Sequence, residues 1–214
     1  MIPNGRAFVG IDVGGDKKGF HAVALRDHFF EKFSSTNPED IVKWCVDRAD
    51  VVAVDAPCRW SQSSSSRVAE RDLRIAEKKI HSFATPTRDV ALAHKKHFYD
   101  WVFNGEKLYR LLAPRYPLFN GVPTSGSISF ETFPQAIVCS LAGKVVPAKP
   151  KSSGRRKVLR ESGYDEVVLP NIDFVDAALC ALTAEAFANR RTIHFGNSAE
   201  GFIVVPRPSR VSSK

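Results

Sequence analysis

The chain has 214 residues, of which 43% are hydrophobic and 25% are charged, and its formal net charge is +8. This composition is ordinary for one globular domain with a sizeable core. The sequence has no apolar stretch of roughly 20 residues, which excludes a membrane-spanning helix. The sequence pI of about 9.5 favours a polyanionic partner, either nucleic acid or a nucleotide.

Targeting and redox signals predict a cytoplasmic protein. The N-terminal residues lack the basic region, apolar stretch and cleavage site of a signal peptide. The four cysteines have no Cys-x-x-Cys spacing and mostly apolar neighbours, so we expect reduced thiols and no zinc site. They are Cys45, Cys58, Cys139 and Cys180. The sequence does not define an oligomeric state.

The first predicted strand carries a carboxylate at its end. Residues 7–13 form an apolar run that contains Asp12 and leads into Gly14 and Gly15. Because the run does not alternate apolar and polar residues, we expect a strand that is buried on both faces. A buried carboxylate needs a cation, hydrogen bonds or open water, whereas glycines let backbone amides or a phosphate approach closely. The pattern predicts either a divalent-metal site or a phosphate-binding turn.

The next segments predict an antiparallel meander followed by a helix. Residues 19–25 and 28–33 have strand composition and are separated by a tight turn, so they extend the first strand in antiparallel order. Asn37 is suited to cap a helix and Pro38 to occupy its first position, and acidic residues follow in the first turn.

A second apolar strand, residues 51–57, also carries an aspartate near its end, Asp55. A strand–helix–strand sequence implies a crossover connection, so this fourth strand is expected to lie parallel to the first. Asp12 and Asp55 are then expected at the same end of neighbouring strands.

Residues 59–127 are expected to form a mainly helical insertion on this core. A helix predicted over 67–80 has apolar residues on one side and a basic stripe on the other. The stripe consists of Arg67, Arg71, Arg74 and Lys78. We expect it either to contact nucleic-acid phosphates or to be a solvated helix face. A second helix is expected over 90–103, and 115–127 is rich in proline and glycine.

Two later segments carry further charged candidates. Alternation over 127–133 predicts a strand on which Glu131 points either into the site or to solvent. Residues 147–157 are predicted as a basic loop, in which Lys151 and Arg155 either clamp phosphates or are simply exposed.

The final predicted helix, residues 173–189, is apolar nearly all round and carries two acids at its start. Asp173 and Asp176 are three residues apart and therefore share one helix face. They could cap the helix, or they could converge with the strand carboxylates. A short strand over 201–205 and a basic tail complete the chain.

The acidic residues together suggest a metal site. Converging carboxylates repel one another unless cations lie between them. Hard oxygen ligands suit Mg²⁺ or Mn²⁺, and two such ions support phosphodiester hydrolysis. The catalytic candidates are Asp12, Asp55, Asp173, Asp176 and Glu131, and the four aspartates are also the expected metal ligands.

The order of elements resembles the ribonuclease H-like fold, in which acids lie at the ends of the first and fourth strands and on the last helix. Asp12, Asp55 and the Asp173/Asp176 pair match those places. Two motifs also look like those of RuvC-type Holliday-junction resolvases: Gly10-Ile11-Asp12 and Asp173-x-x-Asp176-Ala177-Ala178. The resemblance implies a single α/β domain over 1–214, with a mixed sheet of three antiparallel strands followed by parallel strands, flanked by helices.

More closely, the chain resembles domain-of-unknown-function family 429 (DUF429), whose members are predicted nucleases of this fold. The resemblance spans residues 7–190 through short motifs in the same order. These are Gly10-Ile11-Asp12, Val54-Asp55-Ala56-Pro57, Glu70-Arg71-Asp72, Phe130-Glu131-Thr132-Phe133-Pro134, Lys151-x-x-Gly154 and Asp176-Ala177-Ala178-Leu179. The helical insertion departs from the minimal ribonuclease H core.

Three functions follow in order of preference. The first is a metal-dependent nuclease that acts through the aspartates and holds the nucleic-acid backbone with basic residues. The expected phosphate contacts are Arg67, Arg71, Arg74, Lys151 and Arg155. The second is a single-domain relative of the sugar-kinase and actin-like ATPases, whose phosphate turns can also read Gly-Ile-Asp-x-Gly-Gly. The third is a nucleic-acid binder without catalysis.

Overall fold

The computed structural model describes residues 7–63, 65–95, 97–122 and 126–208. Within these ranges the central element is a seven-stranded sheet in the order β3-β2-β1-β4-β7-β9-β8. Its strands are β1 (Ala7–Val13), β2 (Phe20–Arg26), β3 (Phe29–Ser35), β4 (Ala49–Asp55), β7 (Ile128–Glu131), β8 (Thr192–Asn197) and β9 (Gly201–Pro206). The expected basic tail, from residue 209, lies outside the described residues, as do residues 123–125 of the proline- and glycine-rich segment.

The strand pairing confirms the fold expected from the sequence. β1, β2 and β3 form an antiparallel meander, and β4 lies parallel to β1 after the crossover through α1 (Pro38–Val46). β7 pairs parallel with β4, and β9 pairs parallel with β7. This is a ribonuclease H-like mixed sheet. The edge strand β8 was not predicted, because its half-buried residues do not form an apolar run.

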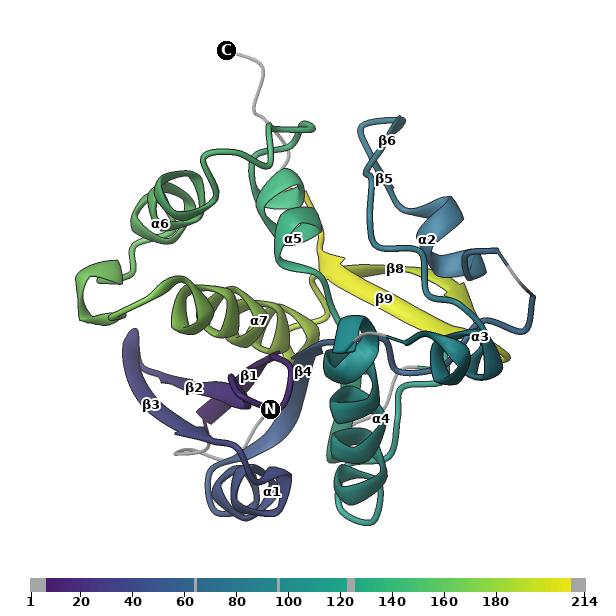
Figure 1. Cartoon of the computed structure of the whole chain (residues 1–214). Helices are drawn as coiled ribbons and strands as arrows, with labels where there is room; N and C mark the ends of the chain where they lie inside the picture. The colour runs from purple at the N-terminus through teal and green to yellow at the C-terminus, as the bar shows by residue number, and fades with distance from the viewer. Residues whose placement is uncertain (1–6, 64, 96, 123–125, 209–214) are drawn as a thin grey trace.

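Helices cover both faces of the sheet (Figure 1). The remaining helices are α2 (Val68–Asp72), α3 (Arg88–Ala93), α4 (Asp100–Leu112), α5 (Pro134–Leu141), α6 (Lys151–Glu161) and α7 (Ile172–Ala188), with short 3₁₀ turns η1 (His97–Tyr99) and η2 (Glu166–Val168). α5, α6 and α7 contribute to the core on one face, whereas α1 and α4 pack on the other. Among the described residues, no helix combines the length and apolar character needed to cross a bilayer.

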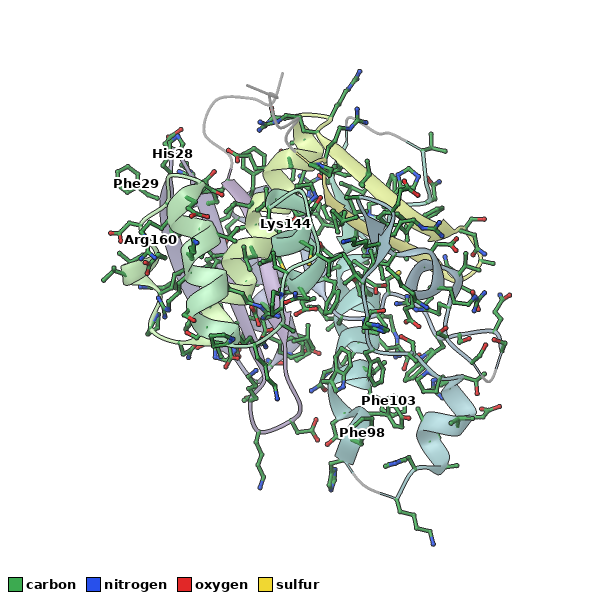
Figure 2. All side chains as sticks on the ribbon, turned by 90° about the horizontal axis from the view of Figure 1, so that it is seen from above. His28, Phe29, Phe98, Phe103, Lys144 and Arg160 are labelled. Atoms are coloured by element: carbon green, nitrogen blue, oxygen red, sulfur yellow. The ribbon has the colours of Figure 1, made fainter. Side chains whose placement is uncertain are left out.

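The view from above shows two separate groups of labelled side chains (Figure 2). His28 and Phe29, in and after the β2–β3 turn, lie near Arg160 of α6 at one end. Phe98 and Phe103 lie at another part of the surface, around the start of α4.

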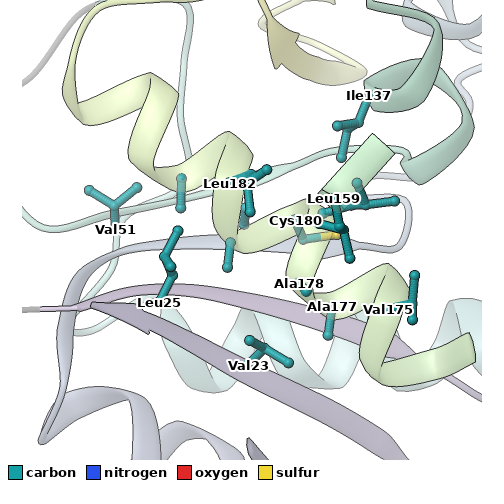
Figure 3. Close-up of a cluster of buried hydrophobic side chains, with 14 of the residues drawn as sticks. Val23, Leu25, Val51, Ile137, Leu159, Val175, Ala177, Ala178, Cys180 and Leu182 are labelled. Carbon is teal, nitrogen blue, oxygen red and sulfur yellow. The ribbon is translucent and has the colours of Figure 1, made fainter. Parts of the chain in front are cut away.

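α7 buries most of its residues, and its small residues bring it close to the strands. Ala177 and Ala178 lie above β1 and β2, with Val23 and Leu182 in the same cluster of buried side chains (Figure 3). The contact is closest at Gly10, in the middle of β1. A Cβ at this position would lie 2.1 Å from the carbonyl oxygen of Ala177, so only glycine lets the two backbones meet.

The helix expected over 67–80 is wrong. α2 ends at Asp72, and the chain then forms a small hairpin of β5 (Arg74–Ile75) and β6 (Lys78–Lys79). Ala76 and Glu77 have positive φ values of 48° and 61°, which make the turn. Tertiary contacts override the helical spacing here, so the basic residues do not form a stripe on one helix.

Two other expected elements also differ from the structure. The helix expected over 90–103 is divided, because α3 ends at Ala93 and α4 starts at Asp100, with η1 between them. The basic loop expected over 147–157 is largely helix α6, which buries Arg155 and Leu159 on one face. The four-residue spacing of these two residues is the helical signal that the charge run obscured.

The close contact at Gly10 predicts that Gly10→Ala strongly destabilises the protein. The added methyl group cannot be placed without separating β1 from α7, so we expect a loss of about 3 kcal/mol or more in the free energy of unfolding, measured by urea denaturation. Gly154→Ala is the control, because a Cβ there meets nothing within 4 Å. It should stabilise α6 by about 0.5–1 kcal/mol. Equal stability of the two variants would contradict this packing.

Candidate active site

The carboxyl ends of β1 and β4 bring two aspartates side by side. Asp12 and Asp55 are in register in the parallel pair, as expected from the crossover. Gly10 and Ala53 precede them by two residues, and strand side chains alternate between faces, so all four positions face α7. Asp12 is only 6% exposed, and Asp55 is partly buried.

α7 supplies two further carboxylates. Asn171 caps this helix, and its side-chain oxygen accepts hydrogen bonds from the backbone N–H groups of Asp173 and Phe174 at 3.1 and 3.0 Å. The capping interpretation of Asp173 is therefore wrong, because Asn171 fills that position. Asp176, one turn further along, is completely buried.

Asp12 belongs to two adjoining sets of potential ligands. In the first set, Asp12, Asp55 and Asp176 each place a carboxylate oxygen within 4.8 Å of the others. The second set joins Asp12 to Asp173 and His21 at the same spacing. His21 lies opposite Asp12 in the β1–β2 pair, and its buried Nδ1 makes no hydrogen bond within the described residues.

The turn between β1 and β2 places a lysine over the carboxylates. The Nζ atom of Lys18 lies 2.6 Å from Oδ1 of Asp173 and 3.5 Å from Oδ2 of Asp12. A Cβ at Gly14 would lie 2.6 Å from Cδ of Lys18, so this glycine leaves room for the lysine stem. Gly14 therefore accommodates the side chain of Lys18 beside the carboxylates.

α6 supplies two more cations, and both reach Asp176. Arg155 donates a hydrogen bond from Nη1 to Oδ1 of Asp176. The Nζ atom of Lys151 lies 3.0 Å from Oδ2, but outside hydrogen-bonding geometry. Arg155 is 7% exposed and holds Asp176 in place, so it is neither the flexible phosphate clamp nor the simply exposed side chain that we expected. Half of the Lys151 side chain remains exposed.

The crowded carboxylates have raised pKa values. Burial raises the pKa of Asp12 to about 7, and the carboxylates of Asp176 and Asp173 add to this rise, while the ammonium of Lys18 opposes it. Burial also raises the pKa of Asp55, to which the charges of Asp12 and Asp176 contribute. The fold therefore holds the carboxyl groups of Asp12 and Asp55 in positions where their charged forms are destabilised.

This donor set fits a hard divalent cation. The ligand atoms of the first set are carboxylate oxygens, which are the ligands that Mg²⁺ and Mn²⁺ prefer. Oδ2 of the buried Asp176 has no hydrogen-bond donor within the described residues. Lys18, Lys151 and Arg155 contact the carboxylates of Asp12, Asp173 and Asp176.

Glu131 lies on the opposite face of the sheet from the aspartates. It pairs with Val54 in the β4–β7 register, one position away from Asp55, so the alternation of side chains directs it away from α7. Both of its oxygens accept hydrogen bonds from Arg67, at 2.6 and 2.7 Å. Neither orientation that we expected is correct, because Glu131 is 4% exposed and takes part in a buried ion pair.

The basic residues that we expected on one helix face lie in different environments. Arg67 is 1% exposed and is held by Glu131 and by Glu70, whose Oε1 accepts from Arg67 Nε at 2.8 Å. It cannot reach a phosphate in this position. Arg71 and Arg74 are exposed, but they lie on α2 and β5, respectively.

Sequence reasoning missed three residues that shape this region. Lys18 and His21 lie beside Asp12. The sequence could have indicated them only through their position in the turn and strand that directly follow Asp12. Glu200, between β8 and β9, accepts hydrogen bonds from the backbone N–H groups of Gln62 and Val68 at 2.9 and 2.8 Å. It ties the serine-rich loop to the sheet edge, a contact between distant segments that no local pattern indicates.

The sheet order and the acids at its centre define a ribonuclease H-like α/β protein with a carboxylate cluster. The family model described as "Protein of unknown function (DUF429)" matches residues 10–200, and the chain belongs to this family. Among solved structures, the chain is similar to Thermus thermophilus RuvC, with a TM-score of 0.43 and 16% sequence identity over 86% of this chain and 95% of that chain. Comparison with curated proteins gives no match.

The raised pKa of Asp12 predicts a pH-dependent effect of Asp12→Asn. The pKa is about 7 in the folded protein and 3.8 for the unperturbed group, so stability falls as the pH rises through this interval, because the unfolded chain releases the proton that the folded protein retains. The variant lacks this charge, and its gain in unfolding free energy should be about 1–3 kcal/mol larger at pH 8 than at pH 5. Urea denaturation in EDTA measures this. Asp27→Asn, in the exposed β2–β3 turn, should give the same result at both pH values.

The buried Arg67–Glu131 pair predicts that Glu131→Gln is costly. The substitution leaves the guanidinium charge of Arg67 without its partner, so we expect a loss of about 3–5 kcal/mol in unfolding free energy. Glu31→Gln provides the control, because Glu31 pairs with Arg48 at the surface and should cost less than about 1 kcal/mol. Similar losses in both variants would show that the buried pair does not have this structural role.

Proposed function

We propose that the protein is a metal-dependent nuclease that hydrolyses phosphodiester bonds in nucleic acid. The observation that carries this proposal is the convergence of Asp12, Asp55 and Asp176, whose carboxylate oxygens lie within 4.8 Å of one another. These acids come from the first strand, the fourth strand and the last helix, which are the acidic positions of the ribonuclease H-like superfamily. The basic charge of the chain, +8, suits a polyanionic substrate.

The four aspartates divide naturally between two ions. Asp12 belongs to both ligand sets, so it would bridge two ions of Mg²⁺ or Mn²⁺. Asp55 and Asp176 would complete one ligand set, and Asp173 and His21 the other. Divalent ions at such sites supply Lewis-acid stabilisation of the charge that develops on a phosphodiester during hydrolysis.

The basic residues around the cluster would have two different tasks. Lys18 and Lys151 each expose about half of the side chain, so they can turn from the carboxylates to phosphate oxygens of a bound strand. Arg155 is buried and would keep Asp176 oriented. Arg71 and Arg74 are exposed and remain proposed phosphate contacts.

Asp12→Asn and Asp55→Asn are expected to lower Mg²⁺- or Mn²⁺-dependent cleavage at least about 100-fold, because each removes a ligand charge. Cleavage of labelled single-stranded, duplex and branched DNA and RNA measures this, with circular dichroism to check folding. Asp27→Asn should cleave like the wild type. Cleavage that persists in purified Asp12→Asn would contradict the mechanism, and oligonucleotide binding by the wild type without cleavage would favour a non-catalytic binder.

A further inference from the structure

A surface rich in aromatic rings lies between α3 and the start of α4. Phe98 is 55% exposed, and Leu92 on α3 is 56% exposed. A hollow of about 190 Å³ is lined by Leu92, and His94, Tyr99 and Phe103 also contribute to its lining. Exposed apolar side chains gathered in this way usually mark a site of interaction. We call His94, Phe98, Tyr99 and Phe103 the aromatic surface.

The rings continue from this surface toward the carboxylate cluster. The centroid of Tyr99 lies 4.9 Å from that of Phe98 and 6.1 Å from that of Phe83. Phe83 in turn lies 5.1 Å from Trp101. Phe83 and Trp101 both line a small cavity of about 60 Å³ that Asp55 also lines. A row of rings therefore connects solvent-exposed Phe98 with the end of β4.

α4 is also attached directly to the turn that carries Lys18. Asn104 donates a hydrogen bond from Nδ2 to the carbonyl oxygen of Gly14 at 2.9 Å. A side chain at Gly15 would lie in contact with Asp100, at 3.7 Å from its Cβ. α4 therefore packs directly against the β1–β2 turn, and this turn carries Lys18, which contacts Asp12 and Asp173.

Exposed lysines and the charge of the whole chain suit an anionic ligand. Lys95 precedes the start of α4 and Lys17 lies in the β1–β2 turn, and both are exposed. Asp100 lies 2.9 Å from His97, Asp16 accepts a hydrogen bond from Asn104 at 3.3 Å, and the net charge of the chain is +8. Rings beside exposed lysines are the combination that binds single-stranded nucleic acid, in which base faces stack and the backbone meets positive charge.

We propose that the aromatic surface stacks unpaired nucleobases, so that the preferred substrate is single-stranded or locally unpaired nucleic acid. This inference rests on the proposed function for its class of ligand and adds the strandedness of the substrate. A duplex hides its base faces within the stack, so it offers the rings nothing to contact. The ring row would then guide an unpaired strand from Phe98 toward Asp55.

The test compares binding of a fluorescein-labelled 20-residue oligothymidylate with binding of a 20-base-pair duplex, by fluorescence anisotropy in EDTA, where metal-dependent cleavage cannot occur. Wild-type protein should bind the single strand at least tenfold more tightly. Phe98→Ala should weaken single-strand binding about fivefold or more, and Phe98→Leu should behave similarly because it keeps apolar surface but loses the ring. Phe98→Tyr should bind like the wild type.

Phe29→Ala is the matched control. Phe29 is 78% exposed on β3, at a different part of the molecule from Phe98 (Figure 2), and its removal should leave binding unchanged. Equal effects of Phe98→Ala and Phe29→Ala, or equal binding of single strand and duplex, would overturn the inference. A Phe98→Ala variant that alters only the oligomeric mass in light scattering would also overturn it, because the surface would then join copies of this chain.

Mn²⁺-dependent cleavage by the same proteins separates this inference from the proposed function. Phe98-dependent single-strand binding without cleavage would support the stacking surface and contradict hydrolysis. Cleavage that Phe98→Ala and Phe29→Ala both retain fully, with unchanged single-strand binding, would support hydrolysis and contradict the stacking surface.

Discussion

The structure depends on the direct contact between the backbones of β1 and α7 at Gly10. A Cβ at this position would lie 2.2 Å from the backbone nitrogen of Ala181, so the contact requires glycine on the strand and small residues on the helix. Because strand side chains alternate, the residue two positions after Gly10 faces the same helix. That residue is Asp12, and the contact therefore sets its separation from Asp176 on α7. The site follows from the packing of the core.

This packing has an electrostatic cost that the surrounding cations only partly offset. Asp12 and Asp55 have raised pKa values because burial and neighbouring carboxylates disfavour their charges. Lys18 reaches the cluster from the β1–β2 turn, whereas Lys151 and Arg155 reach it from α6. Both surrounding segments thus place cations against the cluster, and its carboxylate oxygens are the kind of ligand that suits a divalent cation. The same four carboxylates therefore affect both the stability of the fold and its proposed function.

The sequence predicted the parts of this arrangement that local patterns and chain connectivity control. The apolar runs that carry Asp12 and Asp55, and the crossover between them, were sufficient to predict their register. The position of Glu131 depends on which residue of β4 it pairs with, and a shift of one residue changes the face. The helix expected over 67–80 failed for a related reason, because Leu73, Ile75 and Ile80 pack in one buried cluster with residues of α5 and β9, which are distant in sequence. Contacts between distant segments decided these two outcomes, whereas α6 was missed because a run of charges obscured its local helical spacing.

The most direct test of the central claim is anomalous X-ray diffraction from crystals of the full chain soaked in Mn²⁺. The account predicts an anomalous peak bounded by carboxylate oxygens of Asp12, Asp55 and Asp176, which already lie within 4.8 Å of one another, and no peak there in Asp12→Asn crystals. A cluster that keeps its side-chain cations and shows no peak at saturating Mn²⁺ would contradict the account. It would mean that Lys18, Lys151 and Arg155 permanently neutralise these acids.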